Sequence, residues 1–153
     1  MIEAAGLWKT FEDKKRGVVR AVDGVSFRCE PGQIYGLLGA NGAGKTTTLR
    51  MLATILEPTD GTARVAGYDI VEHPEKVRAS IGFLSTATAL YARLTAYEMV
   101  QYFGRLYGLD DATIARRIDD LFTRLEMNEF RNGRCEKLST GMKQKVSIAR
   151  TLV

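Results

Sequence analysis

Apolar residues in the N-terminal third of the chain come in short runs separated by residues that favour turns. The separators are Gly17, the pair Asp23-Gly24 and the pair Pro31-Gly32. Short apolar runs bounded in this way are typical of β-strands. The pattern therefore predicts strands over residues 2–8, 18–22, 25–29 and 33–38.

Helical spacing of apolar residues begins after the last of these strands, over residues 44–56, and stops at Pro58. In the second half of the chain, apolar positions again recur every three or four residues, which is typical of amphipathic helices. Residues 99–107 and 114–125 are predicted helices, and a last helix begins at Ser139. Two more strands are predicted over residues 62–66 and 80–83.

This order of elements favours an α/β fold with a small antiparallel β layer and a helical insertion. Asp110 and Asp111 place negative charge where the second of the C-terminal helices begins, and the helix dipole favours it there. No stretch of the sequence has the composition of a linker between independent domains.

Composition restricts the class of protein. The chain has 153 residues, of which 45% are hydrophobic and 26% are charged, as in a single soluble globular domain. Disordered, collagen-like and disulfide-scaffold proteins are excluded by these values. No apolar run approaches the roughly 18 residues of a membrane span, and the first residues do not resemble a signal peptide. The predicted location is the cytoplasm.

The net charge of +4 suits an anionic partner. Lys and Arg are dispersed among acidic residues, so a nucleic-acid interface is not predicted. Cys29 and Cys135 are isolated and are expected to be free thiols in a reducing compartment. His73, before Pro74, is expected in a surface turn, so a metal site built from protein nitrogen and sulfur is not predicted.

The strongest chemical signal lies in the glycine-rich segment 36–47, where Gly39, Gly44, Lys45 and Thr46 match the phosphate-loop pattern G-x-x-x-x-G-K-[ST]. Glycines allow successive backbone N–H groups to point inward around a phosphate, and the following helix adds partial positive charge. Lys45 reaches the β- and γ-phosphates, and the Thr46 hydroxyl is a ligand for Mg²⁺. A glycine-rich turn without a ligand is the alternative. The loop alone leaves a kinase, a GTPase and a transport ATPase open.

A second candidate anion site begins at Ser139, a residue type that caps helices well, with Gly141 in the first helical turn. Two anion sites in one small chain suggest that two subunits bind one nucleotide between them. The sequence around this site also carries a resemblance. The matching segments are Val22-Asp23-Gly24-Val25-Ser26-Phe27, the phosphate loop, Glu57-Pro58-Thr59-Asp60-Gly61, Ile81-Gly82-Phe83-Leu84, Leu94-Thr95-Ala96-Tyr97-Glu98 and Leu138-Ser139-Thr140-Gly141-Met142.

In this order and spacing, the segments resemble the ATP-binding subunits of ABC transporters over essentially the whole chain, with 138–142 standing at the signature LSGGQ. A finer similarity is to the NatA-like branch that serves ABC-2 type exporters. The resemblance implies a P-loop NTPase fold of the ABC ATPase type, with an antiparallel β subdomain and RecA-like core over about 1–84, a helical subdomain over about 85–138 and the signature helix over 139–153. It also implies ATP, Mg²⁺, a second ATP-binding subunit and a membrane permease, with the protein peripheral on the inner face of the membrane.

The resemblance assigns roles to individual residues. Phe11 stands where an aromatic residue stacks on adenine, and Thr86 stands where a Gln contacts Mg²⁺ and the attacking water. Ser139, Thr140 and Gly141 would face the γ-phosphate held by the other subunit. Apolar residues 90, 91 and 94 either contact the permease or are plain packing. The phosphates would be held by Gly39, Asn41, Gly42, Ala43, Gly44, Lys45, Thr46 and Thr47.

One expected element is absent from the sequence. The family's next strand ends in Asp-Glu and supplies the general base, but no run of four apolar residues followed by Asp-Glu occurs here. We therefore expect a truncated cassette whose sheet has a gap, which binds ATP weakly, does not hydrolyse it at a useful rate, and aggregates or is partly molten by itself. A non-hydrolysing nucleotide-binding module and a soluble ABC ATPase without a membrane partner are the alternatives.

Overall fold

The structure is a computed structural model that describes residues 1–15, 17–85 and 89–153. The chain packs as two compact units, Met1–Ile81 and Gly82–Val153. Each unit has its own hydrophobic core, so each is described separately.

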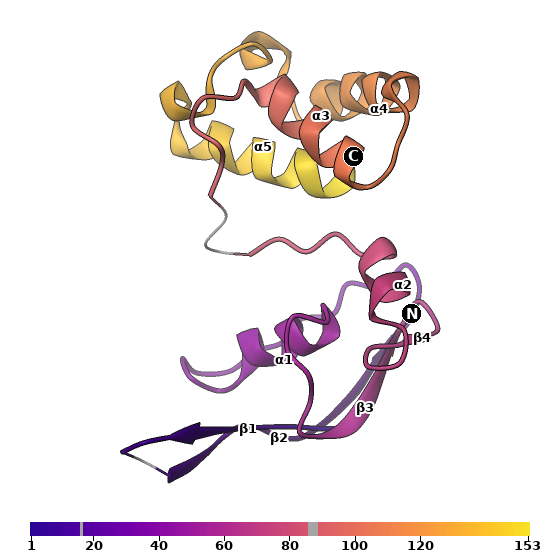
Figure 1. Cartoon of the computed structure of the whole chain (residues 1–153), viewed down its shortest axis with the longest axis vertical. Helices are drawn as coiled ribbons and strands as arrows, with labels where there is room; N and C mark the ends of the chain where they lie inside the picture. The colour runs from indigo at the N-terminus through magenta and orange to yellow at the C-terminus, as the bar shows by residue number, and fades with distance from the viewer. Residues whose placement is uncertain (16, 86–88) are drawn as a thin grey trace. The chain divides into compact units, whose positions relative to one another are not determined.

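The first unit contains a four-stranded antiparallel sheet with the order β2-β1-β3-β4. The two long strands form a hairpin whose register runs from Ile2 opposite Cys29 to Asp13 opposite Gly17 (Figure 1). This sheet is the antiparallel β layer that the sequence predicts. Its strands are β1 (Ile2–Asp13), β2 (Gly17–Cys29), β3 (Asp60–Val65) and β4 (Tyr68–Asp69).

The second strand is continuous, so the prediction of two strands over 18–22 and 25–29 is wrong. The Asp23-Gly24 pair does not end the strand, because the ladder absorbs it as an irregularity: Leu7 pairs with Val25, and Lys9 pairs with Val22. Gly24 has a φ of 63°, and the Trp8 ring packs over it. A local turn signal is thus overridden by pairing with the neighbouring strand.

Helix α1 (Lys45–Leu52) packs on the sheet and covers the core of the first unit. It is shorter than the predicted 44–56 helix, since Thr54 takes a left-handed φ of 57° and ends the helical path. A short helix, α2 (Pro74–Ala79), was not predicted. His73 precedes it and is exposed, as expected. The core residues of this unit are Ala4, Leu7, Val22, Met51, Leu52, Ala63, Val65, Ile70 and Val77.

The predicted strands over 33–38 and 80–83 are not strands in the structure. Both edges of β1 are already occupied, by β2 and β3, so residues 33–38 find no strand partner among the described residues. Ile34 is fully exposed and Leu38 is 96% exposed, whereas Tyr35 stacks on Phe27 with ring centroids 4.9 Å apart. An apolar run predicts a strand only where a neighbouring strand completes its hydrogen bonds.

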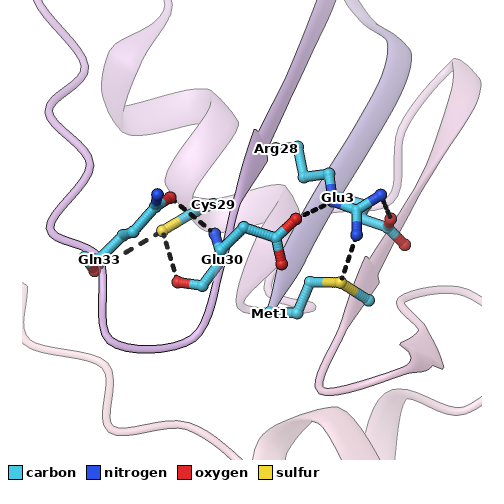
Figure 2. A network of polar contacts seen from close by, with 6 residues as sticks. All are labelled: Met1, Glu3, Arg28, Cys29, Glu30 and Gln33. Carbon is cyan, nitrogen blue, oxygen red and sulfur yellow. Dashed lines mark hydrogen bonds and ion pairs between the residues drawn. The ribbon is translucent and has the colours of Figure 1, made fainter.

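A polar network ties the N-terminus to the end of β2 (Figure 2). The Arg28 guanidinium lies 3.1 Å from the Glu3 carboxylate and 2.5 Å from that of Glu30. The Glu30 backbone N–H donates to the Gln33 side chain at 3.0 Å, and the Cys29 thiol lies 3.7 Å from the Gln33 carbonyl oxygen. These groups are largely exposed, so the network adds little to stability.

The second unit is helical and contains α3 (Ala96–Leu106), α4 (Asp111–Arg124) and α5 (Thr140–Leu152). Two 3₁₀ turns, η1 (Asn128–Phe130) and η2 (Cys135–Lys137), connect α4 to α5. None of the helices in the described part of the chain is long and apolar enough to cross a membrane. The core of this unit consists of Ala96, Met99, Val100, Ile114, Ile118, Phe122, Met127, Cys135, Leu138, Val146, Ala149 and Val153.

The predicted helices of the second half are confirmed, together with the residues expected to begin them. Asp110 caps α4 by accepting a hydrogen bond from the Thr113 backbone N–H at 2.9 Å. Gly104 lets α3 and α4 approach closely, because a Cβ there would lie 2.8 Å from Ile114. Cys135 is buried and free, as expected, and burial raises the pKa of its thiol.

A capping box begins α3. The Thr95 hydroxyl oxygen accepts from the Glu98 backbone N–H at 3.1 Å, while the Glu98 carboxylate accepts from the Thr95 backbone N–H at 2.8 Å. Bonds from the Thr95 backbone and then its hydroxyl lower the pKa of Glu98. The stabilisation that this carboxylate contributes is therefore present above the unfolded pKa of about 4.3 and is lost as the pH falls through the lower folded value.

We predict that Thr95→Ala lowers the melting temperature by about 2 to 4 °C near pH 7. The difference from the wild type should shrink in thermal melts below about pH 4. Glu98→Gln keeps an acceptor for the box but does not titrate, so its melting temperature should depend less on pH over the same range. An undiminished Thr95→Ala difference at pH 3 would contradict this account.

Candidate functional site

The glycine-rich loop leads directly into α1 and is shaped by close contact with β2. Gly44, the residue before the helix, has a φ of 81°, and a Cβ on it would collide with the carbonyl oxygen of Ala21. Gly42 has a φ of 86°, and side chains rarely adopt this region. The glycines are therefore required by the path of the loop as well as by access to a ligand.

Lys45 folds back across the loop. Its ammonium group donates to the carbonyl oxygens of Gly39 and Ala40, each at 2.6 Å. Within residues 1–15, 17–85 and 89–153, no carboxylate forms an ion pair with Lys45. The half-buried positive charge is thus compensated only by backbone dipoles, and an anion placed at the loop would be attracted to it.

The loop encloses a cavity of about 240 Å³. The first backbone hydrogen bond of α1 runs from the Thr48 N–H to the Gly44 carbonyl oxygen at 2.8 Å. The N–H groups of the first helical turn before Thr48 therefore have no partner within the helix and supply partial positive charge. The residues that line the cavity are Ala21, Asn41, Gly42, Ala43, Gly44, Lys45, Thr46 and Thr47.

These features fit a polyphosphate with a bound divalent cation. The cavity combines an ammonium group, helix N–H donors and a side chain of Thr46 that is exposed to solvent. No acidic residue lies in the first turn of α1 to repel an anion. Among the described residues, no cluster of His, Cys, Asp or Glu could hold a metal ion. Thr46 would therefore act together with phosphate oxygens in holding a cation.

Phe11 lies on β1, in the same unit as the loop. It pairs with Val19 of β2, two residues before Ala21, which lines the loop cavity. The ring is 41% exposed. This register places an accessible aromatic ring on the same hairpin as the Ala21 wall of the cavity. The stacking role of Phe11 stays a prediction.

Ser139, Thr140 and Gly141 begin α5, in the second unit. The Ser139 hydroxyl oxygen accepts from the Met142 backbone N–H at 3.3 Å, so the predicted cap is confirmed. All three residues are exposed, and no atom of the described residues outside its own stretch of helix lies within 4 Å of a Cβ built on Gly141. The first turn of this helix is therefore open to a ligand or to another molecule.

The remaining predicted positions are Thr86 and the apolar residues 90, 91 and 94. Thr86 lies outside the described residues. Leu90 and Leu94 pack against the core of the helical unit, so packing accounts for them. Tyr91 is exposed and contacts the Tyr102 ring edge-on at 5.6 Å.

Two residues near the site were missed from the sequence. Ala21 forms a wall of the loop cavity, and Lys9 lies over the Phe11 ring. Nothing in the local sequence distinguishes Ala21, because its role arises from the packing of the loop on β2. Lys9 could have been found from its i,i+2 spacing to Phe11, which places both side chains on one face of a strand.

Comparison with known proteins agrees with this geometry. The sequence profile of the family described as "ABC transporter" matches residues 22–153, which include the phosphate loop and the start of α5. The chain belongs to the ABC transporter family. Its fold is that of the ABC ATPase cassette, as the resemblance implied. It is 49% identical to the ABC transporter ATP-binding protein NatA of Bacillus subtilis (strain 168), with all of this chain and 62% of that protein covered.

A second ABC relative is the daunorubicin/doxorubicin resistance ATP-binding protein DrrA of Streptomyces peucetius, 38% identical over 99% of this chain and 44% of that protein. Thus the chain spans less than two thirds of either relative. A solved ATP-binding subunit of an ABC transporter superposes with a TM-score of 0.83, at 28% identity over 98% of this chain and 60% of that one. The dimeric cassette MJ0796 superposes with a TM-score of 0.86, at 25% identity over 99% and 69%.

Proposed function

We propose that the protein containing this chain is the ATP-binding subunit of an ABC-type membrane exporter, which it drives by ATP binding, head-to-tail dimerisation and hydrolysis. The observation that carries the proposal is Lys45, whose ammonium is held 2.6 Å from two loop carbonyls beside the open N-terminus of α1. An ammonium group and free helix N–H donors at one cavity support a triphosphate as the ligand. Hydrolysis is proposed for the whole protein.

In this proposal the backbone N–H groups of the loop and α1 bind the phosphates, and Lys45 exchanges its carbonyl contacts for β- and γ-phosphate oxygens. Thr46 would hold Mg²⁺, which offsets phosphate charge during transfer. Thr86, whose hydroxyl is shorter than the usual Gln side chain, would reach that cation only through a water molecule. Phe11 would stack on the base, which gives affinity with little hydrogen-bond readout.

Ser139, Thr140 and Gly141 are proposed to contact the γ-phosphate bound by a second subunit. Their exposure among the described residues supports this role, because a second molecule could reach the start of α5. The related cassette MJ0796 is described as dimeric. Two such subunits would bury two nucleotides between them and separate after hydrolysis.

The transport role rests on the relatives. NatA is an ABC transporter ATP-binding protein, and DrrA is a resistance ATP-binding protein. We infer a permease as the membrane partner and a location on the inner face of the membrane.

The test is to purify the full-length protein together with its membrane partner and to measure ATP binding and phosphate release. Mg²⁺-dependent ATP turnover and co-purification of a multi-helix membrane protein are expected. ATP binding without turnover would favour a non-hydrolysing nucleotide-binding module. Turnover with no membrane partner would favour a soluble ABC ATPase.

A further inference from the structure

Lys9 is held in place over the Phe11 ring. Its ammonium lies 5.4 Å from the ring centroid and donates to the carbonyl oxygen of Glu57 at 2.6 Å. The next residue, Thr10, is tied to the same loop by its backbone N–H, which donates to the Thr59 hydroxyl oxygen at 3.1 Å. The cation therefore has a fixed position, set by the loop that leads into β3.

This contact affects the part of the Phe11 ring that stays accessible. A cation on one face of an aromatic ring draws the π electrons toward itself. The opposite face is then less repulsive toward an electron-rich purine that stacks on it. Holding the ring in one orientation also reduces the entropy lost when a base stacks.

We propose that Lys9 is a positioning residue for the nucleotide base: it orients and polarises the Phe11 ring and thereby strengthens stacking of a purine. The inference rests on the proposed function and adds to it a residue that acts on the base through Phe11. Lys9 itself touches neither base nor phosphate in this scheme.

The scheme differs from simple attraction between a lysine and a triphosphate. If the Lys9 charge acted on the phosphates, its loss would weaken inorganic tripolyphosphate and ATP alike. If it acts through Phe11, its loss weakens ATP and leaves tripolyphosphate unchanged. The ratio of the two dissociation constants therefore reports contacts to the nucleoside, and the Phe11→Ala background assigns the effect of Lys9 to stacking of the base.

The chain offers a matched control in Arg20, which lies on the neighbouring strand, opposite Thr10. Its guanidinium is 5.8 Å from the Trp8 ring, so it makes the same kind of contact with a different ring. Arg20→Met removes the same unit of charge from the same hairpin without altering Phe11. Lys9→Arg keeps a cation near Phe11 and serves as the conservative variant.

The experiment measures dissociation constants of ATP and of tripolyphosphate by calorimetry on the full-length protein. Lys9→Met is expected to weaken ATP binding about two- to five-fold, to leave tripolyphosphate binding unchanged, and to be rescued by Lys9→Arg. Arg20→Met should change neither constant. In a Phe11→Ala background, Lys9→Met should have no further effect on ATP binding, because the ring through which it acts is gone.

Equal weakening of ATP and tripolyphosphate by Lys9→Met would overturn the inference, as would an undiminished effect in the Phe11→Ala background. Unchanged tripolyphosphate binding shows at the same time that the variant is folded around its phosphate loop. If the wild-type protein binds tripolyphosphate and ATP with equal affinity, the base makes no contact and this inference is overturned. The proposed phosphate site would still stand. A wild type that binds neither would overturn the proposed function itself.

Discussion

Replacement of Lys45 by methionine is expected to weaken ATP binding by about 10- to 100-fold. Hydrogen bonds that involve a charged group contribute roughly 1.5 to 3 kcal/mol each, and Lys45 is placed to give two of them to phosphate oxygens. The two carbonyl contacts that it gives up, each 2.6 Å long, offset part of this gain. A net loss of about 1.4 to 2.8 kcal/mol then corresponds to roughly 10- to 100-fold weaker binding, since 1.4 kcal/mol is a tenfold change in affinity.

The matched control for this variant is Arg50→Met, which removes one positive charge from the last turn of the same helix, away from the loop cavity. Both variants should retain the circular dichroism of the wild-type protein. Calorimetric titration with MgATP should then give a near-normal dissociation constant for Arg50→Met and a raised one for Lys45→Met. Wild-type affinity in Lys45→Met would mean that ATP is not bound at this loop.

Gly141→Arg is expected to abolish ATP-dependent dimerisation and to leave nucleotide binding by the monomer unchanged. The position is exposed, and in the part of the chain that the structure describes nothing lies within 4 Å of a new Cβ, so the arginine side chain begins without a clash. Arginine also favours the helix more than glycine does, by somewhat under 1 kcal/mol. The side chain would instead occupy the space proposed for the partner's γ-phosphate. Ser139→Arg should have the same effect on dimerisation, with some loss of stability because it removes the cap of α5.

Ala112→Arg provides the control for this effect. Ala112 is the second residue of α4, as Gly141 is of α5, and it is also exposed. Light scattering of the full-length protein with a non-hydrolysable ATP analogue should detect dimers in the wild type and in Ala112→Arg, and monomers in Gly141→Arg. Dimers of normal stability in Gly141→Arg would exclude the proposed role for the start of α5.

The helices of the second half could be predicted because their signals are local. The helix starts at Asp110 and Ser139 and the apolar faces behind them lie within one or two turns of the chain. The strands were harder to predict, because a strand depends on its neighbours. Residues 33–38 have the composition of a buried strand and are exposed instead, while the Asp23-Gly24 pair looks like a turn and lies inside β2.

The candidate site shows the same division. The phosphate loop was readable from four residues at fixed spacing, and three of them, Gly44, Lys45 and Thr46, line one cavity. The wall at Ala21 depends on how the loop packs on β2, at a distance along the chain that no motif spans. Lys9 is close to Phe11 in the sequence, but its ammonium is held by the distant carbonyl oxygen of Glu57, which no local pattern indicates. The sequence thus identifies groups that bind phosphate more readily than those that shape their surroundings.

The two hydrophobic cores share no residue, so we expect each unit to unfold locally in its own events. Separate cores exchange their amide protons through separate local unfolding events. A nucleotide held by the loop stabilises the state to which it binds, so its protection should spread through α1 and the sheet beneath it. The slowly exchanging amides of α4 should keep an unchanged exchange rate until a second subunit binds to the helical unit. Hydrogen exchange would then record nucleotide binding and dimer assembly as two distinct steps.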